Sequence, residues 1–349
     1  MNKESGEKRQ SFISDYMEGA HPLILQRLLE TNMEKTVGYG LDEYCESAKE
    51  KIRAACGCPH AEIYFLIGGT QSNATVIDAL LCSYQGVVAA ESGHISVHEA
   101  GAVELGGHKV LTLPHSFGKL SAEGVLNCLR TYYGDENRDY MVMPGMVYIT
   151  HPTEFGTLYT KEELERLSTV CREYGLPLYL DGARLGYGLA ADNTDVTLEV
   201  IAKNCDVFYI GGTKIGALFG EAVVITKPNL VPHFFSIIRQ HGALLAKGRI
   251  LGIQFDTLFT DDLYFKISKR AVEMAKKMKN GLIKKGYRLY FDSPTNQQFV
   301  ILENKQMDQL AEKIGFGYWE AYDETHTVVR LATSWATKEE DVQRLIELL

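Results

Sequence analysis

Short apolar runs rich in β-branched and aromatic residues alternate, up to about residue 225, with longer segments of helical periodicity. Runs such as Ile63–Ile67 and Leu178–Asp181 are apolar at successive positions, which is typical of strands covered on both faces of a parallel sheet. The pattern predicts an α/β large domain with a mostly parallel, seven-stranded type of sheet flanked by helices. The other expected strands are Gly86–Ala90, Val110–Leu113, Met146–Thr150, Val207–Ile210 and Ala222–Ile225, and the expected helices are Asn73–Cys82, Ala122–Tyr132, Lys161–Tyr174 and Val196–Lys203.

The pattern changes after about Gly252, where a long basic amphipathic helix is expected at Ser268–Lys285. The strands and the helix predicted beyond it belong to a small C-terminal α+β domain. They are Tyr287–Phe291, Gln298–Leu302, Val328–Ala332 and a last helix, Lys338–Leu349, with Thr337 as its start signal. We expect a segment 1–30 that packs on the small domain or on a partner subunit, a large domain 31–250 and a small domain 251–349.

Composition narrows the class of protein. The 349 residues are 45% hydrophobic and 23% charged, with a formal net charge of −9, so a globular chain without a basic footprint for nucleic acid is expected. No apolar run approaches the roughly 20 residues of a membrane span, and the polar start lacks the apolar core of a signal peptide. Seven scattered cysteines indicate free thiols and a cytoplasmic location.

A glycine-containing segment, Gly68–Asn73, follows the first buried strand and opens a helix. Glycines allow close approach of a ligand to the backbone, and free N–H groups at a helix start attract anions. Gly69, Thr70 and Gln71 are therefore candidates for binding a phosphate. The alternative is a glycine-rich turn without a ligand, and the segment is neither a GxGxxG nor a Walker A motif.

Two further candidates follow predicted strands directly. Asp181 stands at the carboxyl end of a strand, where α/β sheets bind ligands, although an aspartate that only caps the following turn is the favoured interpretation when this segment is taken alone. Lys214 is surrounded by glycines and apolar residues, and burial would lower its pKa and favour the free amine that forms a Schiff base. The alternative for Lys214 is an ordinary solvent-exposed lysine.

The histidines His94 and His98 are four residues apart, which is a metal-ligand spacing on a helix. No third ligand accompanies them, and Cys56 and Cys58 lack a second cysteine pair, so no metal site is predicted. Stacking on a flat cofactor suits His94 better, and we expect a structural role for His98.

The order of these segments resembles the threonine aldolase and β-eliminating lyase family of fold-type-I pyridoxal-phosphate enzymes. The matching strings cover nearly the whole chain. They are Ser14-Asp15, Gly38-Tyr39-Gly40, Gly69-Thr70-Gln71-Ser72-Asn73, His94 through Gly101, Asp181-Gly182-Ala183-Arg184 and Thr213-Lys214. The resemblance implies pyridoxal 5'-phosphate as the cofactor and a carbon–carbon lyase that cleaves β-hydroxy-α-amino acids to glycine and an aldehyde.

The resemblance also implies roles for individual residues. Lys214 would form the Schiff base, Asp181 would face the pyridine nitrogen, and His94 would stack on the ring. Gly69, Thr70, Gln71 and Arg184 would complete the cofactor site. Arg330, with help from Arg184 and Ser14, would bind the substrate carboxylate, because a guanidinium can clamp it with two parallel hydrogen bonds.

The family further implies a homodimer or homotetramer whose active sites are shared between subunits. The residues that would reach the neighbouring site are Tyr39, Arg239, Lys247 and Arg249. One departure concerns the acceptor of the hydroxyl proton: many threonine aldolases carry a histidine in a Thr-His-Asn-Gly string, and this chain has Thr153-Glu154-Phe155-Gly156. Glu154, His151 or an ordered water could take that proton.

Two classes of alternative remain at this point. The same cofactor could serve β-elimination or transamination, since those reactions also use an aspartate, a lysine and an arginine. A non-catalytic relative that keeps the fold is the other class, and the complete set Asp181, Lys214 and Arg330 argues against it. A nicotinamide enzyme is disfavoured because no GxGxxG follows a strand.

Overall fold

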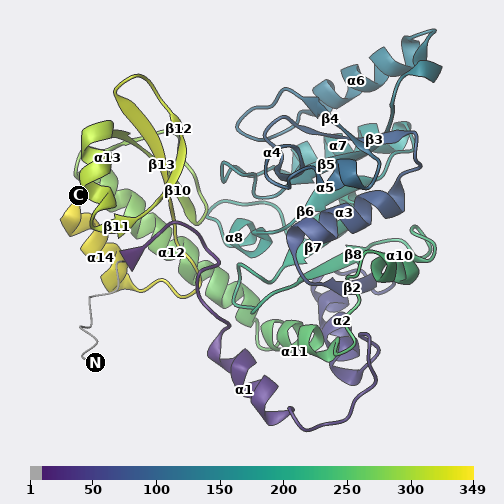
Figure 1. Cartoon of the computed structure of the whole chain (residues 1–349), viewed down its shortest axis with the longest axis horizontal. Coiled ribbons are helices and arrows are strands. Elements are labelled where there is room, and N and C mark those ends of the chain that lie inside the picture. Colours follow the sequence, from purple (N-terminus) through teal and green to yellow (C-terminus); the bar gives the residue numbers. More distant parts are fainter. Residues whose placement is uncertain (1–9) are drawn as a thin grey trace.

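The computed structural model of the chain describes residues 10–349 and has two lobes (Figure 1). The large lobe is built on a seven-stranded sheet and the small lobe on a four-stranded sheet, and the helix α12 (Leu263–Lys284) runs from one to the other. Within the described residues 10–349, no helix has the length and apolar character required to cross a membrane.

The large sheet is mixed but mostly parallel, as the sequence pattern predicts. Its strands follow the order β2-β8-β7-β6-β5-β3-β4. The pairs among β7, β6, β5, β3 and β4 are parallel, whereas β8 is antiparallel to both of its neighbours, β7 and β2. The strands are β2 (Glu62–Leu66), β3 (Gln85–Ala90), β4 (Lys109–Leu113), β5 (Met143–Thr150), β6 (Leu178–Asp181), β7 (Val207–Gly211) and β8 (Glu221–Ile225).

Successive strand residues pack alternately into two separate hydrophobic cores, one on each face of this sheet. Leu178 and Leu180 of β6 pack into the core on one face, whereas Tyr179 between them packs into the core on the other. The first face is covered by α2 (Glu43–Ala55), α6 (Ala122–Gly134), α7 (Lys161–Glu173), α8 (Leu185–Leu189), α9 (Leu198–Asn204) and α11 (Arg249–Leu258), joined by α1 (Pro22–Glu30). The second is covered by α3 (Gly69–Leu80), α4 (His94–Val97), α5 (Ala102–Leu105) and α10 (Phe234–Gln240). A short 3₁₀ turn, Arg138–Tyr140, precedes β5.

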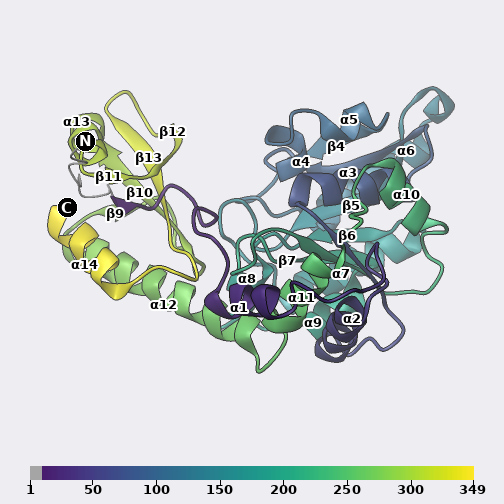
Figure 2. The same ribbon diagram turned by 60° about the horizontal axis from the view of Figure 1, so that its bottom comes forward.

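The small lobe has its own core and is connected to the start of the chain. Its sheet has the order β12-β13-β10-β9, with strands β9 (Arg288–Leu289), β10 (Gln297–Glu303), β12 (Gly317–Ala321) and β13 (His326–Ala332). Helices α13 (Asn304–Ala311) and α14 (Glu339–Leu348) pack against it with the second half of α12. Strand β1 (Gln10–Ser11) pairs with β11 (Ile314–Gly315), so the N-terminal segment crosses the small lobe before it reaches the large one (Figure 2).

Four helix starts differ from the sequence prediction. Helix α9 begins at Leu198 rather than at Val196, and α12 begins at Leu263 rather than at Ser268. Helix α3 begins at Gly69 rather than at Asn73, so the segment expected as a loop is its first turn. Helix α14 begins after Lys338, and Thr337 does not cap it, because the Thr337 hydroxyl accepts a hydrogen bond from the Ser334 N–H instead. At the start of α14, the carboxylate of Asp341 accepts a hydrogen bond from the Lys338 N–H.

Candidate active site

A cavity of about 420 Å³ opens at the edge of the large sheet where β5, β6 and β7 end. Because β2 runs antiparallel to β8, and β8 antiparallel to β7, the carboxyl end of β2 meets the same edge. The cavity thus lies where α/β sheets bind ligands. Its lining includes Tyr16, Gly68, Gly69, Thr70, His94, His98, Thr150, Glu154, Asp181, Arg184, Tyr209, Thr213, Lys214 and Glu221.

The first turn of α3 forms one wall of the cavity. Gly68 precedes the helix in an extended conformation and supplies no side-chain cap, which leaves N–H groups of the first turn available to an anion. A Cβ at Gly69 would lie 3.1 Å from the hydroxyl of Tyr209, so a larger residue there would make a tight contact that Tyr209 must yield to. The predicted Gln71 donates to the His241 carbonyl at 3.4 Å, and its Oε1 is buried without a partner.

Asp181 is buried at the end of β6 and accepts four hydrogen bonds. Tyr148 and Asn73 donate to Oδ2 at 2.6 and 2.9 Å, while Tyr209 and the N–H of Ala183 donate to Oδ1. Burial raises the pKa of Asp181, but the charge of His94 and these hydrogen bonds outweigh it, so the pKa is lowered. The buried carboxyl is therefore kept ionised.

Three tyrosines belong to the hydrogen-bond network around Asp181. Tyr148, Tyr179 and Tyr209 stand two residues before the ends of β5, β6 and β7 on the same face of the sheet. The hydroxyl of Tyr179 donates to Asn73 Oδ1, and Asn73 donates both to Asp181 and to Glu99, which is hydrogen-bonded to His94 at 2.7 Å. One hydrogen-bond network thus connects Asp181 with His94.

Lys214 lies in the loop between β7 and β8, and its side chain enters the cavity. The Tyr187 hydroxyl donates to the Lys214 carbonyl and fixes the loop from the other face. The amine of Lys214 is 5.9 Å from the centre of the Tyr16 ring. Burial, together with the charge of Arg184, lowers the pKa of Lys214, although nearby carboxylates act in the opposite direction.

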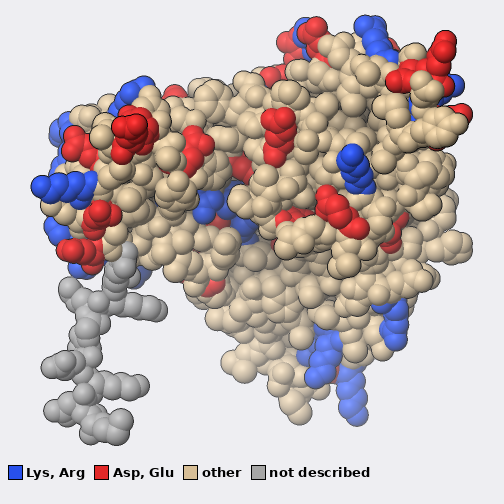
Figure 3. Space-filling model, turned by 45° about the horizontal axis from the view of Figure 1, so that its top comes forward, with Lys and Arg blue, Asp and Glu red and all other residues tan. Residues whose placement is uncertain are grey.

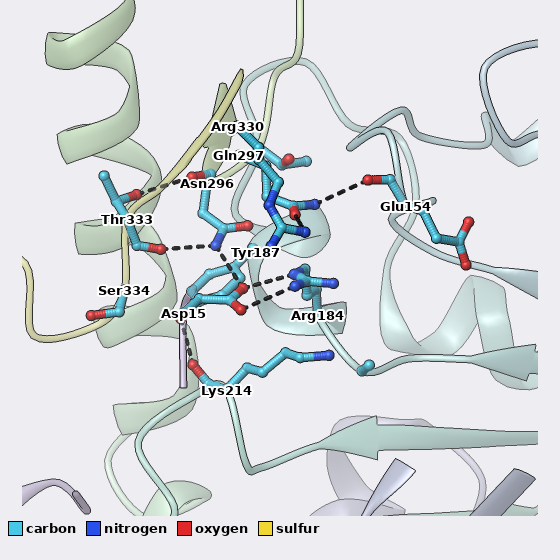
Figure 4. Close-up of polar contacts among 12 residues, drawn as sticks. Asp15, Glu154, Arg184, Tyr187, Lys214, Asn296, Gln297, Arg330, Thr333 and Ser334 are labelled. Atoms are coloured by element: carbon cyan, nitrogen blue, oxygen red, sulfur yellow. Dashed lines mark hydrogen bonds and ion pairs between the residues drawn. The ribbon is translucent and has the colours of Figure 1, made fainter. Parts of the chain in front are cut away.

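The two predicted arginines face each other across the space between the lobes (Figure 4). Arg184 makes a bidentate ion pair with the buried Asp15, with N···O distances of 2.7 and 3.0 Å. Arg330, on β13, donates to Gln297 Oε1 and to the Ile13 carbonyl, both at 3.2 Å, while its Nε is buried without a partner. Ser14, also predicted, is buried and its hydroxyl has no partner. These groups leave donors free for an additional anion.

Glu154 and His151, the two side-chain candidates for a proton acceptor, are placed differently. Glu154 lines the cavity, and its Oε1 accepts hydrogen bonds from Thr150 and from the His94 N–H, both at 2.9 Å. Its Oε2 is buried without a partner, and burial raises the pKa of Glu154. His151 is fully buried with a pKa lowered by burial to about 4, and its Nδ1 accepts the Tyr159 N–H.

The residues expected to reach a neighbouring subunit lie apart from Lys214. The Arg239 guanidinium is 4.9 Å from the centre of the Tyr39 ring. Arg249 donates to carbonyls of its own chain, Thr31 at 2.7 Å and Asn32 at 3.3 Å. Lys247 is exposed on the turn before α11.

Several cavity residues are missing from the prediction made from the sequence. Tyr209 and Glu221 are among them, and His98, expected to be structural, lines the cavity beside His94. Tyr148, also not predicted, does not line the cavity but donates a hydrogen bond to Asp181. A signal for the tyrosines is present in the sequence, because three predicted strands end in the similar strings Tyr-Ile-Thr, Tyr-Leu-Asp and Tyr-Ile-Gly.

Comparison with known proteins identifies the family. The family model of the β-eliminating lyases matches residues 11–305. The chain belongs to the β-eliminating lyase family. A threonine aldolase structure from Leishmania major is 42% identical, with a TM-score of 0.94 over 97% of this chain and 98% of that one. The low specificity L-threonine aldolase of Pseudomonas aeruginosa is 28% identical over 97% of this chain and 96% of its own length.

The fold of this β-eliminating lyase family member is that of the fold-type-I enzymes. The aspartate aminotransferase of Thermus thermophilus, at 14% identity, superposes with a TM-score of 0.70 over 97% of this chain and 90% of that one. The residues of the cavity fit the chemistry of pyridoxal phosphate. The cavity combines a helix start free to bind a phosphate, an ionised Asp181 for a ring nitrogen, and Lys214 for an aldehyde.

Proposed function

We propose that this protein is a pyridoxal-phosphate-dependent lyase that cleaves β-hydroxy-α-amino acids of the threonine, allo-threonine or phenylserine type to glycine and an aldehyde. The main support is that the chain aligns over nearly its whole length with threonine aldolases, including the Leishmania major structure at 42% identity. The presence of Lys214, Asp181 and the α3 N-terminus around one cavity is consistent with this activity.

The cofactor would be held at four points. Lys214 would bind it covalently, Asp181 would accept the ring N–H, and His94 would stack on one face. The first turn of α3, including Gly69, Thr70 and Gln71, would bind the phosphate, with Arg184 nearby. When bound, the cofactor withdraws electrons from the substrate Cα. The ionised Asp181 favours a protonated ring nitrogen, which strengthens that withdrawal.

Arg330 would bind the substrate carboxylate, with Arg184 and Ser14 as its neighbours. The unpartnered Nε of Arg330 and hydroxyl of Ser14 support this assignment, because buried polar groups without partners usually await a ligand or water. A carboxylate fixed there also fixes the direction of the Cα–Cβ bond. We expect Arg330→Lys mainly to raise KM, since lysine lacks the bidentate fork; an unchanged KM would contradict the role.

Glu154 would accept the proton of the β-hydroxyl group. Its raised pKa suits a base near neutral pH, and its Oε2 is free while Oε1 is held by Thr150 and the His94 N–H. His151 does not line the cavity, so it serves as the matched control. We expect Glu154→Gln to lower kcat on phenylserine and allo-threonine about 100-fold or more, and His151→Asn to have little effect on kcat. Full kcat in Glu154→Gln would exclude this base.

The assembly would be a homodimer or homotetramer with shared sites. Tyr39 and Arg239 stack on each other, and together with Lys247 they are the candidates for reaching the neighbour's phosphate. Arg249 is a weaker candidate because carbonyls of its own chain already bind it. Size-exclusion chromatography with light scattering would give the oligomeric state.

The deciding experiment has two parts. Borohydride reduction of the purified holoenzyme followed by peptide mapping should label Lys214, and a label on another lysine would refute the assignment. Release of glycine and aldehyde is then measured on threonine, allo-threonine, phenylserine and serine. Absence of aldehyde from all four, with pyruvate formed from cysteine, would replace the aldolase by a β-eliminating lyase.

A further inference from the structure

Glu221 is a buried carboxyl group of the cavity that the roles above do not use. It is the first residue of β8 and is only 3% exposed. In the sheet register it is paired with Leu66 of β2 on one side and with Gly211 of β7 on the other. Glu221 therefore lies at the binding edge, between the strand that leads to α3 and the strand that leads to Lys214.

Hydrogen bonds attach Glu221 to the loop that carries the lysine. The hydroxyl of Thr213, the residue before Lys214, donates to Glu221 Oε1 at 2.8 Å, and the Gly212 N–H donates to Oε2 at 3.2 Å. The Thr213 hydroxyl in turn accepts a hydrogen bond from the Gly220 N–H at 2.9 Å. Both carboxyl oxygens are thus fixed, and the group shares one wall of the cavity with Lys214.

We propose that Glu221 is a positioning residue that sets the protonation state of Lys214. The Glu221 carboxyl group holds a proton while the lysine is the free amine that condenses with the cofactor aldehyde. When the lysine nitrogen is protonated, the negative charge of the Glu221 carboxylate stabilises it. This inference rests on the proposed function. The condensation itself joins the amine nitrogen to the aldehyde carbon and releases the aldehyde oxygen as water, so it requires no further reactant.

The charges around the pair agree with this role. Burial raises the pKa of Glu221 to about 8, and Asp181 adds to the effect, whereas Thr213 and Lys214 oppose it. Burial also lowers the pKa of Lys214, assisted by Arg184 and opposed by Asp15, Asp181 and Glu221. The proton affinities of the two groups therefore approach each other, so one proton can be exchanged between the carboxyl group and the amine.

The test is a pH titration of the holoenzyme's visible absorption. The Schiff base between the lysine and the cofactor absorbs at about 420 nm when its nitrogen is protonated. The band moves to shorter wavelength when that proton is lost. Glu221→Gln keeps an oxygen for Thr213 but removes the charge, so the midpoint of this change should fall by about one pH unit or more. Glu221→Asp, which keeps the charge, should retain a midpoint closer to that of the wild type.

Glu154→Gln is the matched control, because Glu154 is another buried carboxyl group of the same cavity. It should move the midpoint by much less than Glu221→Gln. A midpoint in Glu221→Gln that equals or exceeds the wild-type value would overturn the inference, and so would an equal shift in both variants. A wild-type band that persists in Lys214→Ala would instead refute the proposed function.

Discussion

The ion pair between Asp15 and Arg184 joins three parts of the chain. Asp15 belongs to the N-terminal segment, Arg184 follows β6, and Asn296 of the small lobe donates to the same carboxylate at 2.9 Å. Asp15 is fully buried, and the Arg184 side chain is 12% exposed. Removing one partner of such a pair leaves a buried charge uncompensated. Asp15→Asn should therefore lower the free energy of unfolding by about 3–5 kcal/mol at pH 7.

The proton affinity of Asp15 gives a separate and smaller figure for the pH-dependent part of this stabilisation. Burial raises its pKa, but Arg184, Lys214 and Asn296 lower it to about 2 from an ordinary 3.8. At about 1.36 kcal/mol per pH unit, that interval corresponds to roughly 2 kcal/mol. Because the folded-state pKa is the lower one, this stabilisation is present above about pH 4 and is lost as the pH falls toward 2.

The assay is urea unfolding of the cofactor-free protein, followed by circular dichroism, for Asp15→Asn, Arg184→Gln and the double variant. The double variant should be more stable than the sum of the single losses predicts, by about 2 kcal/mol. Asp192→Asn is the control, since its partner Lys276 is exposed and no measurable loss is expected. Single losses that add to within about 0.5 kcal/mol would refute the coupling.

Three further substitutions test other parts of the structure. Gly69→Ala places a Cβ 3.1 Å from the Tyr209 hydroxyl, so cofactor affinity measured by fluorescence titration should fall about tenfold and partly recover with Tyr209→Phe; an unchanged affinity would contradict the close packing. Met278→Ala empties a fully buried position of the small-lobe core and should cost about 2–5 kcal/mol in urea unfolding. Thr160→Ala removes the capping box with Glu163 at α7 and should cost about 0.5–2 kcal/mol, whereas no loss would mean that the cap is dispensable.

The central strands of the large sheet could be predicted because they are buried on both faces. Continuous apolar runs such as Leu178–Asp181 leave little ambiguity, and the strand bounds agree to within a few residues. The weakest predictions concern short or half-exposed elements: β12 was not expected, and β9 is only two residues long. Their pairing depends on neighbours distant in sequence, which local patterns do not contain.

Only part of the candidate site could be predicted from the sequence, again because some of its residues come together through contacts distant in sequence. Asp181 stands out because it ends an apolar strand, and Lys214 because it lies among glycines shortly after one. Glu221 does not, since a charged residue that opens a strand looks like an exposed end, and its burial follows from the antiparallel insertion of β8 between β7 and β2. The partnership of Asp15 with Arg184 spans 169 positions and needs the fold to be seen.

The distribution of charge in the cavity indicates which ligands it can hold. Helix α3 offers its N-terminus at one wall, and Arg330 of the small lobe offers a guanidinium group opposite the Asp15-bound Arg184, so two separate anionic groups can be bound. Figure 3 shows charged side chains scattered over the outer surface of this face, with a recess between the lobes. Glu154 and Asp181, both buried carboxyl groups, also line the cavity. A phosphate and one carboxylate fit this arrangement, whereas a second carboxylate beside Glu154 would meet repulsion. We therefore expect substrates with a second carboxylate to be cleaved more slowly than substrates with a neutral side chain.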